Sequence, residues 1–393
     1  MAITVNSIPE DYASVHDDLW FVVDSTNKAQ TNFKYVFDIY INAVQVARVK
    51  NFPDPSSTKG IINAGDIVRN YAKSYFTPNP VKTLFSDTGD DIYVEYEIKY
   101  GEEYGGTLYT NLTVETYVGF NYANPVFRDP SVSYFDDYIS KWLTNRNLGQ
   151  VECAFTDQLF IGYMNASGTN PNMFPSVQLY NEDGSASGSP LTTAATAQDT
   201  FVLADISPTA INAHFASTVI PANTYAYGVK LDNGTSLGPE VKVKLVCNPN
   251  YSPISLHFLN QLGGYDSFGF RTVNKESVTV TRKSFTQNDW SYVASGTKMQ
   301  RYDAFKRINA GVVPFTSEQA VTFKLKSNYV NVVDYTFLRD LIVSPEVDLE
   351  QGGYFYPVVI TTNNWEEKKR IADQMFTLEL DVQLGSKLFS QFR

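Results

Sequence analysis

The chain has 393 residues, two to three times the size of an ordinary domain, so the length predicts two or three folding units. Its 42 acidic residues exceed its 31 basic residues, and the net charge of −11 argues against specific nucleic-acid binding. Two cysteines and three histidines, widely spaced, exclude a disulfide-rich scaffold and zinc sites of closely spaced ligands. Aromatic residues form 14% of the chain, which favours β-sheets and buried protein contacts.

The N-terminal twenty residues contain neither a basic segment nor an apolar one, and no run of about eighteen apolar residues follows. The sequence therefore predicts neither a signal peptide nor insertion into a membrane.

Residues 1–128 predict an N-terminal β-sandwich with one inserted helix. Apolar residues occupy the odd positions from Phe33 to Ile41, the period-two pattern of a strand with one buried face. Asn42-Ala43 permits a tight turn into a second strand. A helix is expected from a cap at Asn63 to Tyr75, because apolar residues there recur at helical spacing. Further strands are expected at 19–23, 92–98 and 112–120.

Residues 129–149 predict a helical connector, because an apolar stripe runs from Tyr134 to Leu143. Residues 150–250 then predict a middle β-sandwich with a long polar loop over 181–190. A single helical turn is expected after Ser207-Pro208, since serine caps helices and proline suits the first helical position. The strands expected in this unit are 151–163, 177–180, 225–231 and 241–246.

Residues 251–393 predict a C-terminal β domain with one short helix. A hairpin is expected with Gly263 and Gly264 supplying positive φ in its turn. The helix is expected over 334–342, ended by Ser344-Pro345. Further strands are expected at 278–281, 321–325, 354–360 and 375–382. The predicted fold class is thus mainly β, with tandem antiparallel sandwiches of immunoglobulin or fibronectin type and a few short helices.

The sequence contains no arrangement of residues that is typical of a catalytic site. Asp87-Thr88-Gly89 resembles the aspartic-protease tripeptide, but that chemistry needs two copies sharing a proton and only one is present. His257 lies between apolar residues, without Ser, Cys or Asp at a catalytic spacing, and is interpreted as structural. Cys153 and Cys247 either pair across the middle unit or remain buried thiols. We therefore expect no enzymatic activity, no cofactor, no metal, and no catalytic, cofactor-binding or metal-ligating residues.

Three blocks of sequence carry a resemblance that spans the chain. They are 19–53, which contains the first hairpin, 258–270 around Gly263-Gly264, and 341–360 around Ser344-Pro345. These blocks resemble virion proteins of crAss-like and related tailed phages of Bacteroidota, including ring-forming tail components. The resemblance implies a structural subunit of the phage tail, a ring or collar component, made in the bacterial host cytoplasm and located in the virion.

What the resemblance implies about partners is a homo-oligomeric ring and contacts with other tail or portal-proximal proteins. Gly263, Gly264, Ser344 and Pro345 are the candidate turn and interface residues, and the N-terminal sandwich and 344–347 are the expected contact regions. Two alternatives stay open: a receptor- or carbohydrate-binding tail module with exposed Tyr and Trp and the 181–190 loop, and a tail-associated hydrolase.

Overall fold

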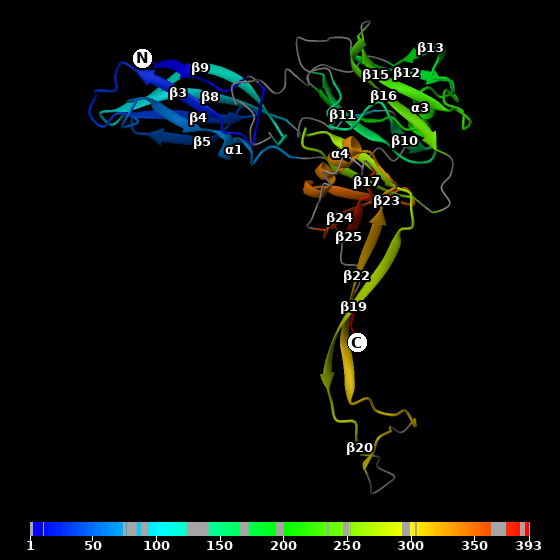
Figure 1. Cartoon of the computed structure of the whole chain (residues 1–393). Coiled ribbons are helices and arrows are strands. Elements are labelled where there is room, and N and C mark those ends of the chain that lie inside the picture. The colour runs from blue at the N-terminus through cyan, green and yellow to red at the C-terminus, as the bar shows by residue number, and fades with distance from the viewer. Residues whose placement is uncertain are drawn as a thin grey trace.

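The computed structural model describes residues 3–10, 12–73, 76, 85–87, 93–123, 141–165, 173–193, 200–233, 236–246, 251, 253–292, 299–302, 305–362, 375–385 and 390–392. The chain is mainly β, as the sequence predicts, with several sheets and a few short helices. An N-terminal sandwich lies beside a middle sandwich and a C-terminal unit, and a long hairpin projects from that unit (Figure 1).

The N-terminal sandwich consists of a three-stranded and a five-stranded sheet. The small sheet has the order β1 (Ile3–Ser7), β3 (Trp20–Ser25), β6 (Gly60–Asn63). The large sheet has the order β2 (Tyr12–Ser14), β9 (Thr107–Phe120), β8 (Tyr93–Tyr104), β4 (Lys34–Ile41), β5 (Val44–Asn51). β2 is parallel to β9, while the other pairs are antiparallel. β1 and β2 stand at the ends of the two strand orders, so the opening segment contributes one edge strand to each sheet. Two sheets linked in this order form an immunoglobulin- or fibronectin-like sandwich.

The core between these sheets is aromatic. Phe21, Tyr35, Phe37, Tyr96 and Tyr117 are each at most 1% exposed. Phe21 meets the Tyr117 ring edge-on at 5.2 Å, an arrangement that adds to the free energy of area burial. The odd positions of β4 face this core, which is the alternation that the sequence predicts.

Two local features of this sandwich are decided by turn chemistry. The predicted hairpin turn is present, and Asn42 and Ala43 both have positive φ, +48° and +61°. The helix is much shorter than expected: α1 spans only Gly65–Val68, with Ala64 as its N-cap. The Asn63 amide oxygen accepts from the backbone N–H groups of Gly65 and Leu19, both at 3.0 Å, so it joins the turn to the opening strand rather than capping a long helix. Tyr75 lies outside the described residues.

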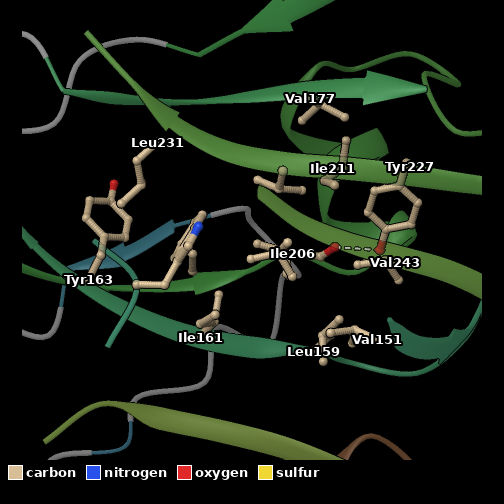
Figure 2. Packing of buried hydrophobic residues seen from close by; sticks show 14 of the residues in the cluster. Val151, Leu159, Ile161, Tyr163, Val177, Ile206, Ile211, Tyr227, Leu231 and Val243 are labelled. Atoms are coloured by element: carbon tan, nitrogen blue, oxygen red, sulfur yellow. Dashed lines mark hydrogen bonds between the residues drawn. The ribbon is translucent and has the colours of Figure 1, made fainter. Parts of the chain in front are cut away.

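The middle sandwich repeats the strand order of the first. Its five-stranded sheet runs β10 (Val151–Ala154), β16 (Ser236–Val246), β15 (Ala226–Asp232), β12 (Phe174–Tyr180), β13 (Ala186–Thr192), again with a parallel pair at the start. β11 (Phe160–Asn165) and β14 (Thr200–Asp205) pair in the facing sheet. Figure 2 shows the core between them, where the buried Tyr227 hydroxyl donates to the Ile206 carbonyl at 2.7 Å.

Two predictions for this unit are wrong. The expected strand 151–163 is split by a turn, and its halves, β10 and β11, belong to different sheets. Half of the expected loop 181–190 is strand: 181–185 form a turn, and β13 follows from Ala186. All seven residues of β13 are exposed, which explains why its sequence shows no apolar alternation. The capped helix is confirmed, since α3 spans Pro208–His214 and Ser207 Oγ accepts from Ala210 N.

The C-terminal unit continues the second sheet of the middle sandwich. The resulting eleven-stranded sheet runs β19 (Lys275–Thr286), β22 (Val312–Lys326), β25 (Glu379–Leu384), β24 (Tyr354–Ile360), β23 (Val347–Gln351), β17 (Ile254–Leu259), β18 (Tyr265–Phe270), β11, β14 and β7 (Phe85–Asp87), with β26 (Ser390–Phe392) beside β22. The edge strand β7 comes from the N-terminal third of the chain and pairs with β14. One sheet thereby joins three parts of the chain.

The predicted C-terminal hairpin and helix are both present. β17 and β18 pair antiparallel around the glycine turn. α4 spans Val332–Val343, capped by Asn331, whose amide oxygen accepts from Asp334 N at 2.8 Å. Most of the predicted connector helix lies outside the described residues, but its end is not helical, because Trp142 forms an antiparallel bridge with Tyr163.

Candidate functional site

The most conspicuous surface feature is the projecting hairpin, residues 275–326, called the arm below. β19 and β22 pair over their length and run away from the rest of the chain toward β20 (Ser291–Tyr292) and β21 (Met299–Gln300) (Figure 1). All twelve residues of β19 are exposed, although it belongs to the same sheet as β17, whose six residues are all buried. Neither face of the outer arm rests on a core of this chain.

The arm exposes many large apolar side chains. Phe305 is 90% exposed and Ile308 is 77% exposed. Further members exposed by 39% or more are Val278, Val280, Phe285, Trp290, Met299, Tyr302, Val312 and Phe315. A two-stranded hairpin is marginally stable alone in water, and contiguous exposed apolar surface usually marks an interaction site. The arm is therefore the best candidate interaction surface on the chain.

The arm also differs in charge from the rest of the chain. It contains nine of the 31 basic residues and four of the 42 acidic residues, so it carries +5 while the remaining residues carry −16. β19 stands at the end of the strand order, so in the described part of the chain one edge of this strand has no partner. A basic, partly apolar hairpin with an open edge suits an acidic protein surface that can also pair with a strand.

The glycine turn between β17 and β18 lies at a junction between units. Gly263 has φ +79°, as the turn prediction requires, whereas Gly264 does not have positive φ, so the prediction is wrong for that residue. A Cβ on Gly263 would lie 2.5 Å from Asn121 O of the N-terminal unit. A Cβ on Gly264 would lie 2.5 Å from Leu143 O. Gln261 O accepts from Ala123 N at 2.8 Å. The turn is thus an intrachain contact, in which a side chain at Gly263 or Gly264 would force apart the turn and the backbone that packs against it.

The other two candidate residues end α4. Ser344 is the C-cap, and its hydroxyl donates to Glu346 O at 2.7 Å; Pro345 follows it. The neighbouring Val347 is 4% exposed and starts β23 inside the large sheet. This segment therefore serves the fold of the C-terminal unit, and nothing in its geometry tests the expected role in contacts between subunits.

A buried polar cluster holds the same junction together. The Asp266 carboxylate accepts from Thr144 Oγ1 at 2.8 Å and from Asn260 Nδ2 at 2.6 Å. Asn260 in turn donates to Leu143 O and accepts from Gly264 N. Burial raises the pKa of Asp266 to about 7, although these hydrogen bonds act in the opposite direction.

His257 has partners that the sequence interpretation did not find. Its Nδ1 lies 2.7 Å from Ser267 Oγ and its Nε2 lies 3.3 Å from Glu350 Oε2, because β17 pairs with β18 on one side and β23 on the other. A serine, a histidine and a carboxylate in a row resemble a hydrolase triad.

The surroundings of this row favour a structural role. The His257 ring is covered by three aromatic rings, those of Phe76, Phe160 and Phe355, at 5.0–5.7 Å. Its side chain is 0% exposed, and Ser267 Oγ already accepts from Phe160 N at 2.8 Å. A nucleophile must meet its substrate, so this geometry supports a satisfied core histidine. Pairing of strands, which no sequence spacing encodes, was the missing signal.

The remaining candidates fall partly outside the description. Asp87 ends β7, and Thr88 and Gly89 lie outside the described residues, as does Cys247. Cys153 is a buried free thiol, and burial raises its pKa. Among described residues no cluster of three His, Cys, Asp or Glu is arranged to hold a metal ion. No helix in the described part is long and apolar enough to cross a membrane.

Comparison with known proteins adds little to this picture. No family model and no curated protein sequence matches the chain. Among solved structures it is similar to the FN1–FN3 domains of chicken CNTN1, with 10% identity and a TM-score of 0.19 over 62% of this chain. The match covers 66% of that chain, just under two thirds. At this TM-score the assignment of sandwich domains rests on the strand order itself.

Proposed function

We propose that this chain is a non-enzymatic structural subunit of a tailed-phage virion, a tail or ring and collar component that assembles with copies of itself. The observation that carries the proposal is the arm, whose strand β19 is exposed at all twelve positions and which presents large apolar side chains to solvent. The sequence blocks that resemble those of phage tail proteins suggest the setting. The virion is then its location, and other tail or portal-proximal proteins are its further partners.

Assembly through the arm follows from its charge and its apolar residues. The arm carries +5 and the rest of the chain −16, so the arm of one copy is attracted to the body of the next. The exposed Phe285, Phe305 and Phe315 would lose water contact there, which supplies free energy that charge alone does not. A head-to-tail contact between different surfaces closes into a ring when its rotation allows.

The proposal is tested by measuring the mass of the purified assembly. In the shortened variant, Asn-Gly replaces residues 284–315, so that the paired residues Lys283 and Thr316 flank a two-residue turn. We expect the full chain to form a closed oligomer of uniform copy number and the shortened variant to remain monomeric. An unchanged oligomer without the arm, or a monomeric full chain at micromolar concentration, contradicts the proposal.

A second variant separates charge from length. Arg282→Glu with Lys283→Glu reverses two exposed charges on β19 and leaves the hairpin intact. The matched control is Lys73→Glu, an exposed lysine outside the arm. We expect the arm variant to associate more weakly, most clearly at low ionic strength, while the control assembles as the parent does.

A second function, recognition of a surface carbohydrate, is favoured by one separate observation. A cleft of about 450 Å³ between the middle sandwich and the C-terminal unit is lined by aromatic, amide and cationic side chains. Such a module and a tail subunit are compatible in one chain. The mass measurement separates them in part, because an adhesin predicts a trimer with an outward free end.

A further inference from the structure

The cleft lies on the outer face of the five-stranded sheet of the middle sandwich. Strand register places Tyr180, Ala226, Lys244 and Glu152 in one row across that face, and all four line the cleft. The intervening residues, such as Tyr227 and Val243, point into the core instead. The C-terminal unit supplies the opposite wall through Phe268, Arg271, the 328–331 segment and Phe337.

Small residues lie at the centre of this face of the sheet. Ala226 lies between the longer Tyr180 and Lys244 in its row, and Gly228 pairs with Lys242 in the next row. A Cβ on Gly228 would lie 2.0 Å from the Glu240 carboxylate. That carboxylate crosses the glycine to accept the Tyr180 hydroxyl at 2.8 Å. The tyrosine at the rim is therefore held in place by a contact that only glycine permits.

Two of the cations that line the cleft, Lys242 and Lys244, have no ion-pair partner among the described residues, whereas Arg271 pairs with Asp157 at 2.7 Å. Lys242 lies over the Tyr180 ring at 5.1 Å and Lys244 over the Tyr225 ring at 5.4 Å, and neither has a carboxylate at ion-pair distance among described residues. Arg146 donates to Ser267 O at 2.7 Å and stacks over Phe337. On a chain of net charge −11, this concentration of free positive charge favours an anionic ligand.

The two carboxylates that line the cleft have partners in the protein. Glu152 lies 3.7 Å from Arg271, and Asp334 accepts from Asn331 Nδ2 at 2.8 Å. Burial also raises the pKa of Asp334. Neither group cancels Lys242 and Lys244.

The other lining groups are those that bind sugars. Tyr329 is 71% exposed and presents an aromatic ring, on which the C–H face of a pyranose can stack. The amides of Gln150, Asn181 and Asn328 offer both donors and acceptors for hydroxyl groups. A cleft of this volume holds a few sugar units.

We propose that this interdomain cleft binds an acidic oligosaccharide, with Lys242 and Lys244 facing its carboxylate or sulfate groups and Tyr329 stacking on a sugar ring. The inference is independent of assembly through the arm. Two residues of the cleft lining, Asn181 and Gly184, belong to the 181–185 turn, which is the first half of the polar loop that the sequence predicted.

The test measures binding of defined oligosaccharides to the full chain by titration calorimetry. The probes are tetrasaccharides of galacturonate, of alginate and of chondroitin sulfate, together with the methyl-esterified galacturonate as a neutral match. We expect saturable binding of at least one acidic probe. If galacturonate is that probe, esterification should weaken binding about tenfold or more, since it removes the charge and keeps the sugar.

Variants locate the site. Lys242→Gln with Lys244→Gln should weaken binding about tenfold, and Tyr329→Ala several-fold. The control, Lys73→Gln with Lys141→Gln, removes two exposed lysines outside the cleft lining and should bind as the parent does. Absence of binding by all three acidic probes at millimolar concentration overturns the proposal. Equal binding by the cleft variant or by the esterified probe overturns it as well. The arm-shortened variant should bind normally, which separates this outcome from failure of assembly.

Discussion

β17 and β19 belong to one sheet and experience opposite environments. Ile254–Leu259 is buried at all six positions, and Lys275–Thr286 is exposed at all twelve. β17 pairs with a strand on each side, and α4 and the rings of Phe76, Phe160 and Phe355 pack against it. β19, in contrast, extends away from the body with β22 as its partner. A strand can thus be hydrogen-bonded into a sheet and still extend well beyond the core against which that sheet packs. This exposure is the reason for proposing that the arm takes part in assembly.

The largest expected difference between the two regions comes from truncating one phenylalanine in each. Phe258 in β17 is 0% exposed, so Phe258→Ala should lower the free energy of unfolding by about 3–5 kcal/mol. Phe285 in β19 is 47% exposed, so Phe285→Ala should cost less than about 0.5 kcal/mol in the dissociated chain. Denaturant unfolding at low protein concentration measures both. Equal costs would mean that the arm folds back onto the body in solution.

The buried side of the sheet should also respond to pH through Asp266. Its pKa in the folded chain, about 7, lies above that of an unfolded aspartate, so the native state holds this proton more tightly. Its contribution to stability is complete below about pH 4 and is lost as pH rises toward 7. That loss is on the order of a few kcal/mol.

Asp266→Asn copies the protonated group and should remove this part of the pH dependence. Its amide can accept from Asn260 and donate to Thr144, the two partners of the carboxylate. Thermal melting between pH 4 and pH 8 should show a shallower decline in the variant, with Lys73→Gln as an exposed control. A parallel decline in parent and variant would show that Asp266 titrates normally.

Two glycines with similar φ sharpen the comparison between buried and exposed backbone. Gly263→Ala places a Cβ at φ +79° and 2.5 Å from Asn121 O, whereas Gly352→Ala meets φ +62° with nothing within 4 Å. We expect about 1 kcal/mol for Gly352→Ala from backbone strain alone. Gly263→Ala should cost about 2 kcal/mol or more, and Gly263→Val more again. Equal losses in the two alanine variants would mean that the junction yields without cost.

The smallest effect is expected at the first hairpin turn. Ala43 has φ +61°, a conformation that glycine adopts without strain, and it occupies the second position of the turn where Asn-Gly is preferred. Ala43→Gly should therefore raise the free energy of unfolding by about 1 kcal/mol. A decrease in the melting temperature would contradict the assigned turn.

The sequence predicted correctly those elements that are determined by interactions between neighbouring residues. Ser207-Pro208 predicted α3, Gly263-Gly264 predicted the turn of the β17–β18 hairpin, and the alternation from Phe33 to Ile41 predicted a strand whose odd positions face a core. The prediction of a single buried face is wrong, because Val36 and Asp38 on the other face of β4 are buried as well. In each case the determinant lies within a few residues: a cap hydroxyl, a positive φ, or a period of two. These elements together indicated a chain of sandwiches with short helices.

The tertiary structure decided which strands share a sheet, and with that every candidate site. Residues 151–163 look like one apolar strand, yet a turn sends β10 and β11 to opposite sheets, and both halves pack into the core between those sheets. The strand expected at 278–281 is present within β19, but all twelve residues of β19 are exposed, because burial depends on what packs against a strand rather than on its own residues. His257 meets Ser267 and Glu350, and Lys244 shares a row with Tyr180 on one wall of the cleft, only through register between segments distant in sequence. Strand register over such separations is set by the packing of the whole chain, so no local pattern contains it.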